Sequence, residues 1–425
     1  MKKIRVLLMV LFAVLFITAC GNQGTEEAPP AEEGSTTKEN ITTEESNKGK
    51  PEATPVETAA PETDYEPAFP EQTRISAVKT EFDYQTSKIT EGLNSPWGIA
   101  VLPNGSFAIT EKGGSLRVMS PEGNLSGVIA GFPEVDSRGQ GGLLDVKAAP
   151  DFAESRMLYF TFSEPSEEGN LTAVAKGRLS DNNTAVENFT VIYRAMPYYE
   201  SEGHFGSRIA LDPEGNLFIS TGDRMDSANR RKVQEFDNGH GKILHITPDG
   251  NAAGESPIEN EEANPEIYSY GHRNVQGLDI HPETGELWAS EMGPEGGDEL
   301  NLILPGRNYG WPLVSYGVEY GGQPVGEGIT EMENTEQPVY YWDPVLAPSG
   351  MTFYSSDEIP EWKNNLFIGG LRSQHIARIV LEDNRVVGEE RFLENEGERF
   401  RDVEMGQDGA LYSITDNGNV YRIGK

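Results

Sequence analysis

The sequence is poor in cysteine, in basic residues and in long hydrophobic runs. Its single cysteine, Cys20, excludes an intramolecular disulfide and a cysteine-based zinc site. Its 34 Lys and Arg stand against 69 Asp and Glu, so the net charge is −35. With no basic patch to offset repulsion, nucleic acid and anionic membrane surfaces are unsuitable direct partners.

The one sustained apolar run lies at the N-terminus, over residues 6–17, after Lys2, Lys3 and Arg5. About a dozen residues are too few to span a bilayer but suit a signal peptide. The run leads into Ile-Thr-Ala-Cys at 17–20, which resembles a bacterial lipobox. We therefore expect a lipoprotein signal over 1–20, lipid attachment at Cys20, and an extracytoplasmic protein that contacts the membrane only through its lipid anchor. The alternative is an ordinary signal peptide that contains a cysteine.

Residues 21–72 consist mainly of Glu, Thr, Pro and Ala, with thirteen acids and three lysines. Such a segment buries too little apolar surface to offset its ordering entropy. We expect a disordered acidic linker over 21–72 and a folded domain over 73–425. The larger part of the negative charge falls on that domain, which suits either solubility or cation binding.

The domain contains a repeat in which an apolar strand, a Pro/Gly/Asn turn and a second apolar strand follow one another. Two clear copies occupy 96–109 and 208–220, and looser copies begin near Gly142, Gly277, Gly350 and Asp402. Six copies leave nearly 60 residues each, enough for a four-stranded blade with long loops. No amphipathic stretch is long enough for βαβ units. The pattern predicts an all-β fold, a six-bladed β-propeller, rather than a pair of sandwiches.

The loops between these strands carry several distinctive motifs. They include Gly-His-Phe-Gly-Ser-Arg at 203–208, Gly-His-Arg-Asn at 271–274, Gly-Pro-Glu-Gly-Gly-Asp-Glu at 293–299 and Asn-Tyr-Gly-Trp-Pro at 308–312. In this order they resemble the soluble pyrroloquinoline quinone (PQQ)-dependent glucose/aldose sugar dehydrogenases, over essentially 73–425. The aldose sugar dehydrogenase branch is the more similar one. The resemblance implies a PQQ- and Ca²⁺-dependent oxidation of aldoses to lactones, with electrons passed to an external acceptor, a quinone or a redox protein.

The resemblance also implies roles for individual residues. PQQ is a tricarboxylate, which arginines can bind through paired hydrogen bonds. His204 would be the general base and Asp223 the carboxylate that orients it. The catalytic Ca²⁺ would bind the carbonyls of Gly293 and Pro294, and a second site would use Asp298, Glu299 and Tyr309. The implied cofactor-binding residues are Gln140, Arg273, Asn274, Arg372, Arg399 and Arg401.

Each of these assignments has an alternative. The arginines could pair with neighbouring acids, His204 could be structural, and Asp298 and Glu299 could cap a turn. Two positions also depart from the family pattern: Gly203 replaces an acid of the glucose-specific enzymes, and Arg372 stands where relatives offer Lys. A Ca²⁺-dependent lactonase and a non-catalytic propeller that binds glycan or protein therefore remain alternative functions.

Overall fold

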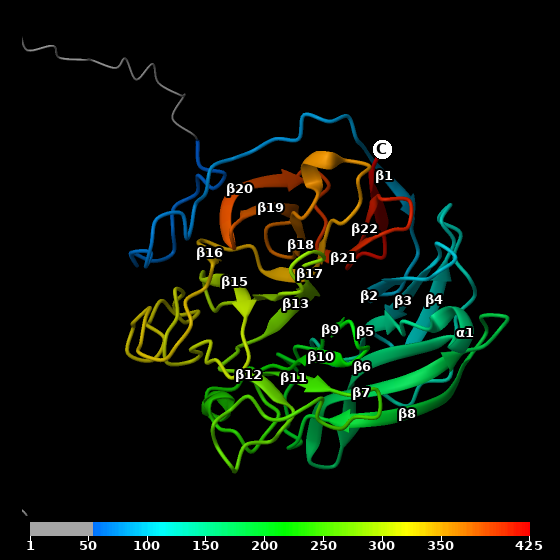
Figure 1. The fold of residues 1–425 in the computed structure, drawn as a ribbon, viewed down its shortest axis with the longest axis horizontal. Coiled ribbons are helices and arrows are strands. Elements are labelled where there is room, and N and C mark those ends of the chain that lie inside the picture. The colour runs from blue at the N-terminus through cyan, green and yellow to red at the C-terminus, as the bar shows by residue number, and fades with distance from the viewer. Residues whose placement is uncertain (1–53) are drawn as a thin grey trace, which may run out of the picture. The chain divides into compact units, whose positions relative to one another are not determined.

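The computed structural model describes residues 54–425, which form six small antiparallel sheets arranged as the blades of a propeller (Figure 1). This confirms the predicted fold. Each predicted repeat falls on the first two strands of one blade, because the innermost strand and its hairpin partner carry the apolar alternation.

The strands follow one another blade by blade. The first blade contains β2 (Pro96–Val101), β3 (Phe107–Glu111) and β4 (Ser115–Met119). The second contains β5 (Leu143–Ala148), β6 (Met157–Ser166), β7 (Gly169–Leu179) and β8 (Val186–Arg194). The third contains β9 (Ile209–Leu211), β10 (Leu217–Ser220), β11 (Lys242–Ile246) and β12 (Ile267–Tyr270). The fourth contains β13 (Val275–Ile280), β14 (Leu287–Glu291), β15 (Asp298–Ile303) and β16 (Tyr340–Trp342). The fifth contains β17 (Pro348–Phe353), β18 (Leu366–Gly370), β19 (Ile376–Glu382) and β20 (Arg385–Phe392). Three short helices, α1 (Phe152–Ser155), η1 (Arg230–Gln234) and η2 (Pro360–Trp362), lie in the connections.

The last blade closes the ring with strands from both ends of the domain. It combines β21 (Phe400–Met405), β22 (Leu411–Thr415) and β23 (Val420–Gly424) with β1 (Gln85–Thr90), which pairs with β23. The shared blade joins the two ends of the repeat, so opening the ring requires breaking a strand pair.

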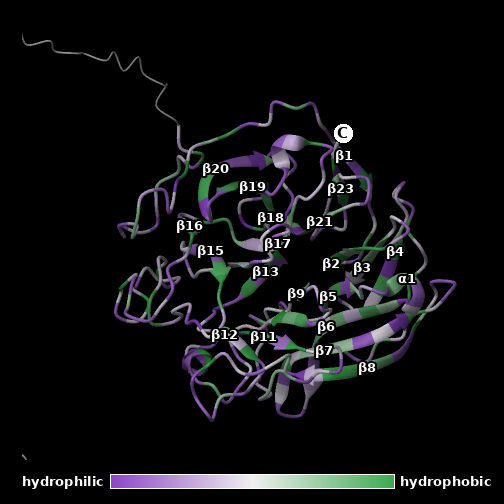
Figure 2. Cartoon of the chain, viewed as in Figure 1, coloured by the Kyte–Doolittle hydropathy of each residue, from purple (hydrophilic) through white to green (hydrophobic). Residues whose placement is uncertain are grey.

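Apolar side chains fill the spaces between blades, while the connecting loops are more hydrophilic (Figure 2). Buried aspartates on inner strands join neighbouring blades: Asp145 on β5 accepts the Ile209 N–H of β9 at 2.8 Å, and Asp402 on β21 accepts the Ile99 N–H of β2 at 3.1 Å. Both also bind the Arg208 guanidinium, at 3.2 and 2.7 Å. This network holds the loops at the inner-strand ends in fixed positions.

The N-terminal part of the described chain differs from the expected disordered linker. Residues 54–72 pack on the propeller, where Val56 pairs with Ile75 and the Asp343 carboxylate accepts the Glu62 and Thr63 N–H groups at 2.7 and 3.3 Å. Gln72 is fully buried and donates to the Pro338 carbonyl. The propeller supplies hydrogen-bonding partners for this segment, and Val56 packs against one of its core clusters.

The predicted signal peptide, Cys20 and residues 21–53 lie outside the described residues. In the described part of the chain, no helix has the length and apolar character needed to cross a membrane.

Candidate active site

His204 and Asp223 form a buried hydrogen-bonded pair. His204 lies in the loop between β8 and β9, and Asp223 follows β10. The imidazole Nδ1 lies 2.7 Å from Asp223 Oδ1, while Asp223 Oδ2 accepts the indole N–H of Trp311 at 2.7 Å. Because Asp223 holds the proton on Nδ1, the lone pair of His204 resides on Nε2, which can accept a proton from a bound molecule.

Burial lowers the pKa of His204, and the charge of Arg273 lowers it further against the opposing effect of Asp223. Burial would raise the pKa of Asp223, but the hydrogen bond and charge of His204 bring it below its ordinary value. The pair is therefore a neutral imidazole beside an ionised carboxylate near pH 7, the protonation state that a general base requires.

The backbone around His204 is unusual. His204 has φ of +49°, a left-handed conformation that costs energy for a residue with a side chain. Its N–H donates to Gln140 Oε1 at 2.9 Å and its carbonyl accepts from Arg224 at 3.3 Å. The Arg224 guanidinium in turn lies 3.7 Å from the centre of the Phe205 ring. These contacts fix the orientation of the imidazole.

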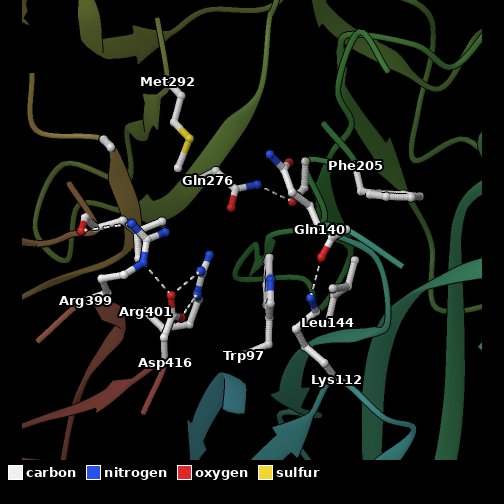
Figure 3. Close-up of a pocket in the computed structure, with 14 residues that line it drawn as sticks. Trp97, Lys112, Gln140, Leu144, Phe205, Gln276, Met292, Arg399, Arg401 and Asp416 are labelled. Carbon is white, nitrogen blue, oxygen red and sulfur yellow. Dashed lines mark hydrogen bonds and ion pairs between the residues drawn. The ribbon is translucent and has the colours of Figure 1, made fainter. Parts of the chain in front are cut away.

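A cavity of about 350 Å³, within the size range of small-molecule sites, opens next to the His204 loop (Figure 3). Phe205 and Gly206 of that loop line it, whereas His204 and Asp223 are not among its lining residues. Trp97, Leu144 and Phe205 form a buried apolar cluster along its wall. The charged lining residues are Lys112, Arg399, Arg401 and Asp416. The cavity thus combines an apolar, aromatic wall with an excess of positive charge in a strongly acidic protein.

Arg399 precedes β21 and Arg401 lies within it; both line the cavity and share Asp416, with nitrogen–oxygen distances of 2.7 Å each. Burial raises the pKa of Asp416, but Arg401 and Arg399 lower it below its ordinary value. Two guanidinium groups that share one carboxylate carry one uncompensated positive charge. They therefore both pair with an acid and remain able to bind an anion.

Arg273 and Asn274 directly precede β13. Arg273 donates to the carbonyls of Met292 and Gly293 at 3.0 and 2.6 Å, and its buried Nε has no partner. The Asn274 side-chain oxygen accepts the Gly206 N–H at 3.1 Å, so this residue supports the His204 loop.

Three of the predicted cofactor residues, Arg273, Asn274 and Arg372, are not among the residues that line the 350 Å³ cavity; Arg273 lines a smaller cavity instead. Arg372 follows β18 with an exposed side chain, whereas its neighbour Leu371 lines the 350 Å³ cavity.

The predicted metal residues lie around the loop between β14 and β15. The Asp298 carboxylate accepts N–H groups of Gly293, Leu346 and Ala347 at 2.9, 2.8 and 2.6 Å, so it shapes this loop. Burial raises the pKa of Asp298 to about 6. These contacts match the alternative in which Asp298 caps a turn.

Glu299 and Tyr309 line a second cavity of about 10 Å³ together with Glu291, Gly293 and Pro294. Burial, followed by the Glu291 charge, raises the pKa of Glu299 to about 8. The nearby side-chain oxygen of Asn301 is buried without a partner. Within residues 54–425 no three His, Cys, Asp or Glu side chains gather as a metal site, so main-chain carbonyls would have to complete any coordination shell here.

Sequence reasoning missed several residues of the site: Trp97, Lys112, Trp311 and Asp416. The sequence signal for Trp97 is its place as the first aromatic residue of a repeat, and the signal for Trp311 is the Asn-Tyr-Gly-Trp-Pro motif. Lys112 and Asp416 lie in ordinary hairpin turns and carry no sequence signal of their own.

Comparison with known proteins agrees with this arrangement. The model of the glucose/sorbosone dehydrogenase family matches residues 93–422. An aldose sugar dehydrogenase of Escherichia coli is 41% identical over 335 residues, which cover 78% of this chain and 90% of the relative. The apo crystal structure of the soluble E. coli aldose sugar dehydrogenase superposes with a TM-score of 0.76 at 39% identity, covering 80% of this chain and 99% of that one. The PQQ-bound aldose sugar dehydrogenase of Streptomyces coelicolor gives 0.67 at 28% identity, covering 81% and 99%. The chain therefore belongs to the glucose/sorbosone dehydrogenase family.

Proposed function

We propose that this protein oxidises aldose sugars to lactones with PQQ and Ca²⁺, and that an external quinone or redox protein takes up the electrons. The observation that carries the proposal is the His204–Asp223 pair, whose loop neighbours Phe205 and Gly206 line a cationic, aromatic-walled cavity. Support also comes from the PQQ-bound state of the S. coelicolor relative and the aldose sugar dehydrogenases of similar sequence.

The residues present fit PQQ. Arg399 and Arg401 match its carboxylates, and Trp97 matches its flat ring system. Arg273, outside the cavity lining, retains a buried N–H without a partner. Gln140 also lines the cavity, at the His204 end. When bound, PQQ would supply an ortho-quinone that accepts a hydride, and with it two electrons, from the sugar.

The residues also fit Ca²⁺, a hard cation that prefers oxygen ligands. A Ca²⁺ at the Gly293 carbonyl would take the place of the Arg273 guanidinium, which donates to that oxygen at 2.6 Å, and the Pro294 carbonyl follows it in the same loop. Glu299 and the Tyr309 segment would hold a second ion, which would relieve the repulsion between Glu291 and Glu299. A bound Ca²⁺ would act as a Lewis acid toward a quinone oxygen.

The protein's own part in the reaction is to hold and move a proton. His204 Nε2 accepts the proton of the sugar's anomeric hydroxyl as hydride leaves C1. Asp223 stabilises the resulting imidazolium through the Nδ1–H bond. Trp311 holds Asp223 from the other side, and the apolar wall of Trp97, Leu144 and Phe205 limits water in the cavity.

A lactonase with a metal at the propeller axis finds less support. The axial carboxylates of Asp145 and Asp402 bind Arg208 and main-chain N–H groups through all four of their oxygens. Those oxygens are the ones that a central cation would need.

The decisive experiment is reconstitution of the purified apoprotein with PQQ and Ca²⁺, followed by aldose with a dye acceptor. We expect saturable, Ca²⁺-dependent binding and sugar-dependent dye reduction. His204→Ala should bind PQQ as the wild type does but should not reduce the dye. Failure of the wild type to bind PQQ would refute the proposal, and full turnover by His204→Ala would remove His204 from the mechanism.

A further inference from the structure

Lys112 is a cavity residue to which neither the motifs nor the family resemblance gives a role. It follows β3, in the turn before β4, and its side chain lines the 350 Å³ cavity. Its Nζ donates to the Gly139 carbonyl at 2.7 Å. Among residues 54–425 no carboxylate lies within ion-pair distance of this ammonium, so two of its three N–H groups are available to a ligand.

The charges around Lys112 favour an added anion. Burial lowers the pKa of Lys112, and the charge of Arg401 lowers it further, while Asp416 acts in the opposite direction. Asp416 already binds both Arg399 and Arg401. Three cations thus face one acid in the same cavity, and a bound carboxylate would relieve their mutual repulsion.

The cations lie at separate places around the aromatic wall. Figure 3 shows Trp97 between Lys112 on one side and the group of Arg399, Arg401 and Asp416 on the other. The Arg208 guanidinium lies 4.1 Å from the centre of the Trp97 ring and stabilises the position of the indole. This spacing suits a flat ligand that carries carboxylates on opposite edges.

We propose that Lys112 is a third cationic ligand-binding residue of this cavity, and that it donates to a carboxylate of a planar aromatic polycarboxylate. The inference rests on the proposed function, since PQQ is a compound of this class. Lys112 would secure the edge of the ligand that Arg399 and Arg401 do not reach. Its contact with Gly139 also links that edge to Gln140, whose side chain holds the His204 N–H.

The test measures binding by the full-length apoprotein with two probes, PQQ and the redox-inactive benzene-1,3,5-tricarboxylate, through quenching of tryptophan fluorescence. Lys112→Gln removes the charge but keeps an amide that can donate to Gly139. Lys112→Arg keeps the charge. The control is Lys176→Gln: Lys176 also donates to a main-chain carbonyl, that of Pro248, and in addition pairs with Asp249, but it lies outside the cavity lining.

We expect Lys112→Gln to raise the Kd of both probes by about tenfold or more, the usual effect of losing a hydrogen bond between charged groups. Its binding should also depend less on salt, because one ionic contact is lost. Lys112→Arg should recover most of the affinity, and Lys176→Gln should bind as the wild type does.

Unchanged affinity in Lys112→Gln for both probes would overturn the inference. A loss of thermal stability with unchanged affinity would also overturn it, since Lys112 would then serve only to hold the Gly139 loop. If the wild type binds no PQQ, the proposed function fails, and the tricarboxylate titration alone decides the role of Lys112.

Discussion

Replacement of Asp223 by Asn tests the catalytic arrangement most sharply, because the carboxylate accepts three hydrogen bonds at once. Its oxygens accept from His204 Nδ1 at 2.7 Å, the Met225 N–H at 2.8 Å and the Trp311 indole at 2.7 Å. An asparagine of almost the same shape offers only one acceptor oxygen. It must therefore mismatch either Trp311 or His204.

Both orientations of the amide have a calculable cost. If the amide oxygen faces His204, the buried indole N–H meets a second donor, and losing its partner costs about 1–3 kcal/mol of folding free energy. If the amide nitrogen faces His204, Nδ1 becomes an acceptor, the proton moves to Nε2, and the base is lost. Loss of the carboxylate also lowers the pKa of His204, because Asp223 raises it. We expect kcat to fall by roughly 10²–10⁴, the range of general-base contributions.

The assay is anaerobic single-turnover reduction of enzyme-bound PQQ by aldose, with the Kd of PQQ measured in parallel. Asp226→Asn is the matched control: Asp226 lies three residues away and accepts hydrogen bonds from Tyr199 and the Ala228 N–H, but not from His204. We expect the control to react at the wild-type rate. A rate for Asp223→Asn within about threefold of wild type, well below the expected general-base effect, would refute the proposed role of the pair.

Three further predictions concern pH, the N-terminal segment and calcium. Because burial and Arg273 lower the pKa of His204, activity should be lost only as pH falls below the ordinary imidazole pKa of about 6.5. A fall in kcat/KM with a midpoint at or above that pH would contradict the electrostatic argument. A chain that starts at residue 73 should unfold at lower urea concentration than one that starts at 54, by about 1 kcal/mol for each buried hydrogen bond lost; equal stability would show that these contacts are dispensable. Without Ca²⁺, the raised pKa of Glu299 means that the folded state holds a proton which the unfolded chain releases, so the free energy of unfolding should fall as pH rises from about 4.5 to about 8. Ca²⁺ should reduce this fall and Glu299→Gln should abolish both effects, as urea titrations would show; a Ca²⁺ response unchanged in Glu299→Gln would place the ion elsewhere.

The limits of sequence-based prediction here have physical causes. The His204 and Arg273 motifs were recognisable because unusual residues cluster within short loops. Asp416 was not, because its role depends on Arg399 and Arg401, which lie 15 to 17 residues away along the chain and meet it only across a hairpin. The sequence did not predict that residues 54–72 are ordered, because composition describes only the surface that a segment can bury by itself. Gln72 and Thr63 are instead held by hydrogen-bonding partners more than 240 residues away in the sequence.

The sequence by itself determined the repeat, the number of blades and the set of loop residues that carry the chemistry, because strand alternation and turn chemistry are local properties. Only the tertiary structure decided which side chains share a cavity. Closure of the ring by β1 and β23 brings loops of separate blades to one mouth, places Lys112 near Arg401, and leaves Arg372 outside the cavity lining. Those relations depend on the direction of each side chain at a strand end and on contacts between distant segments, which no local pattern encodes.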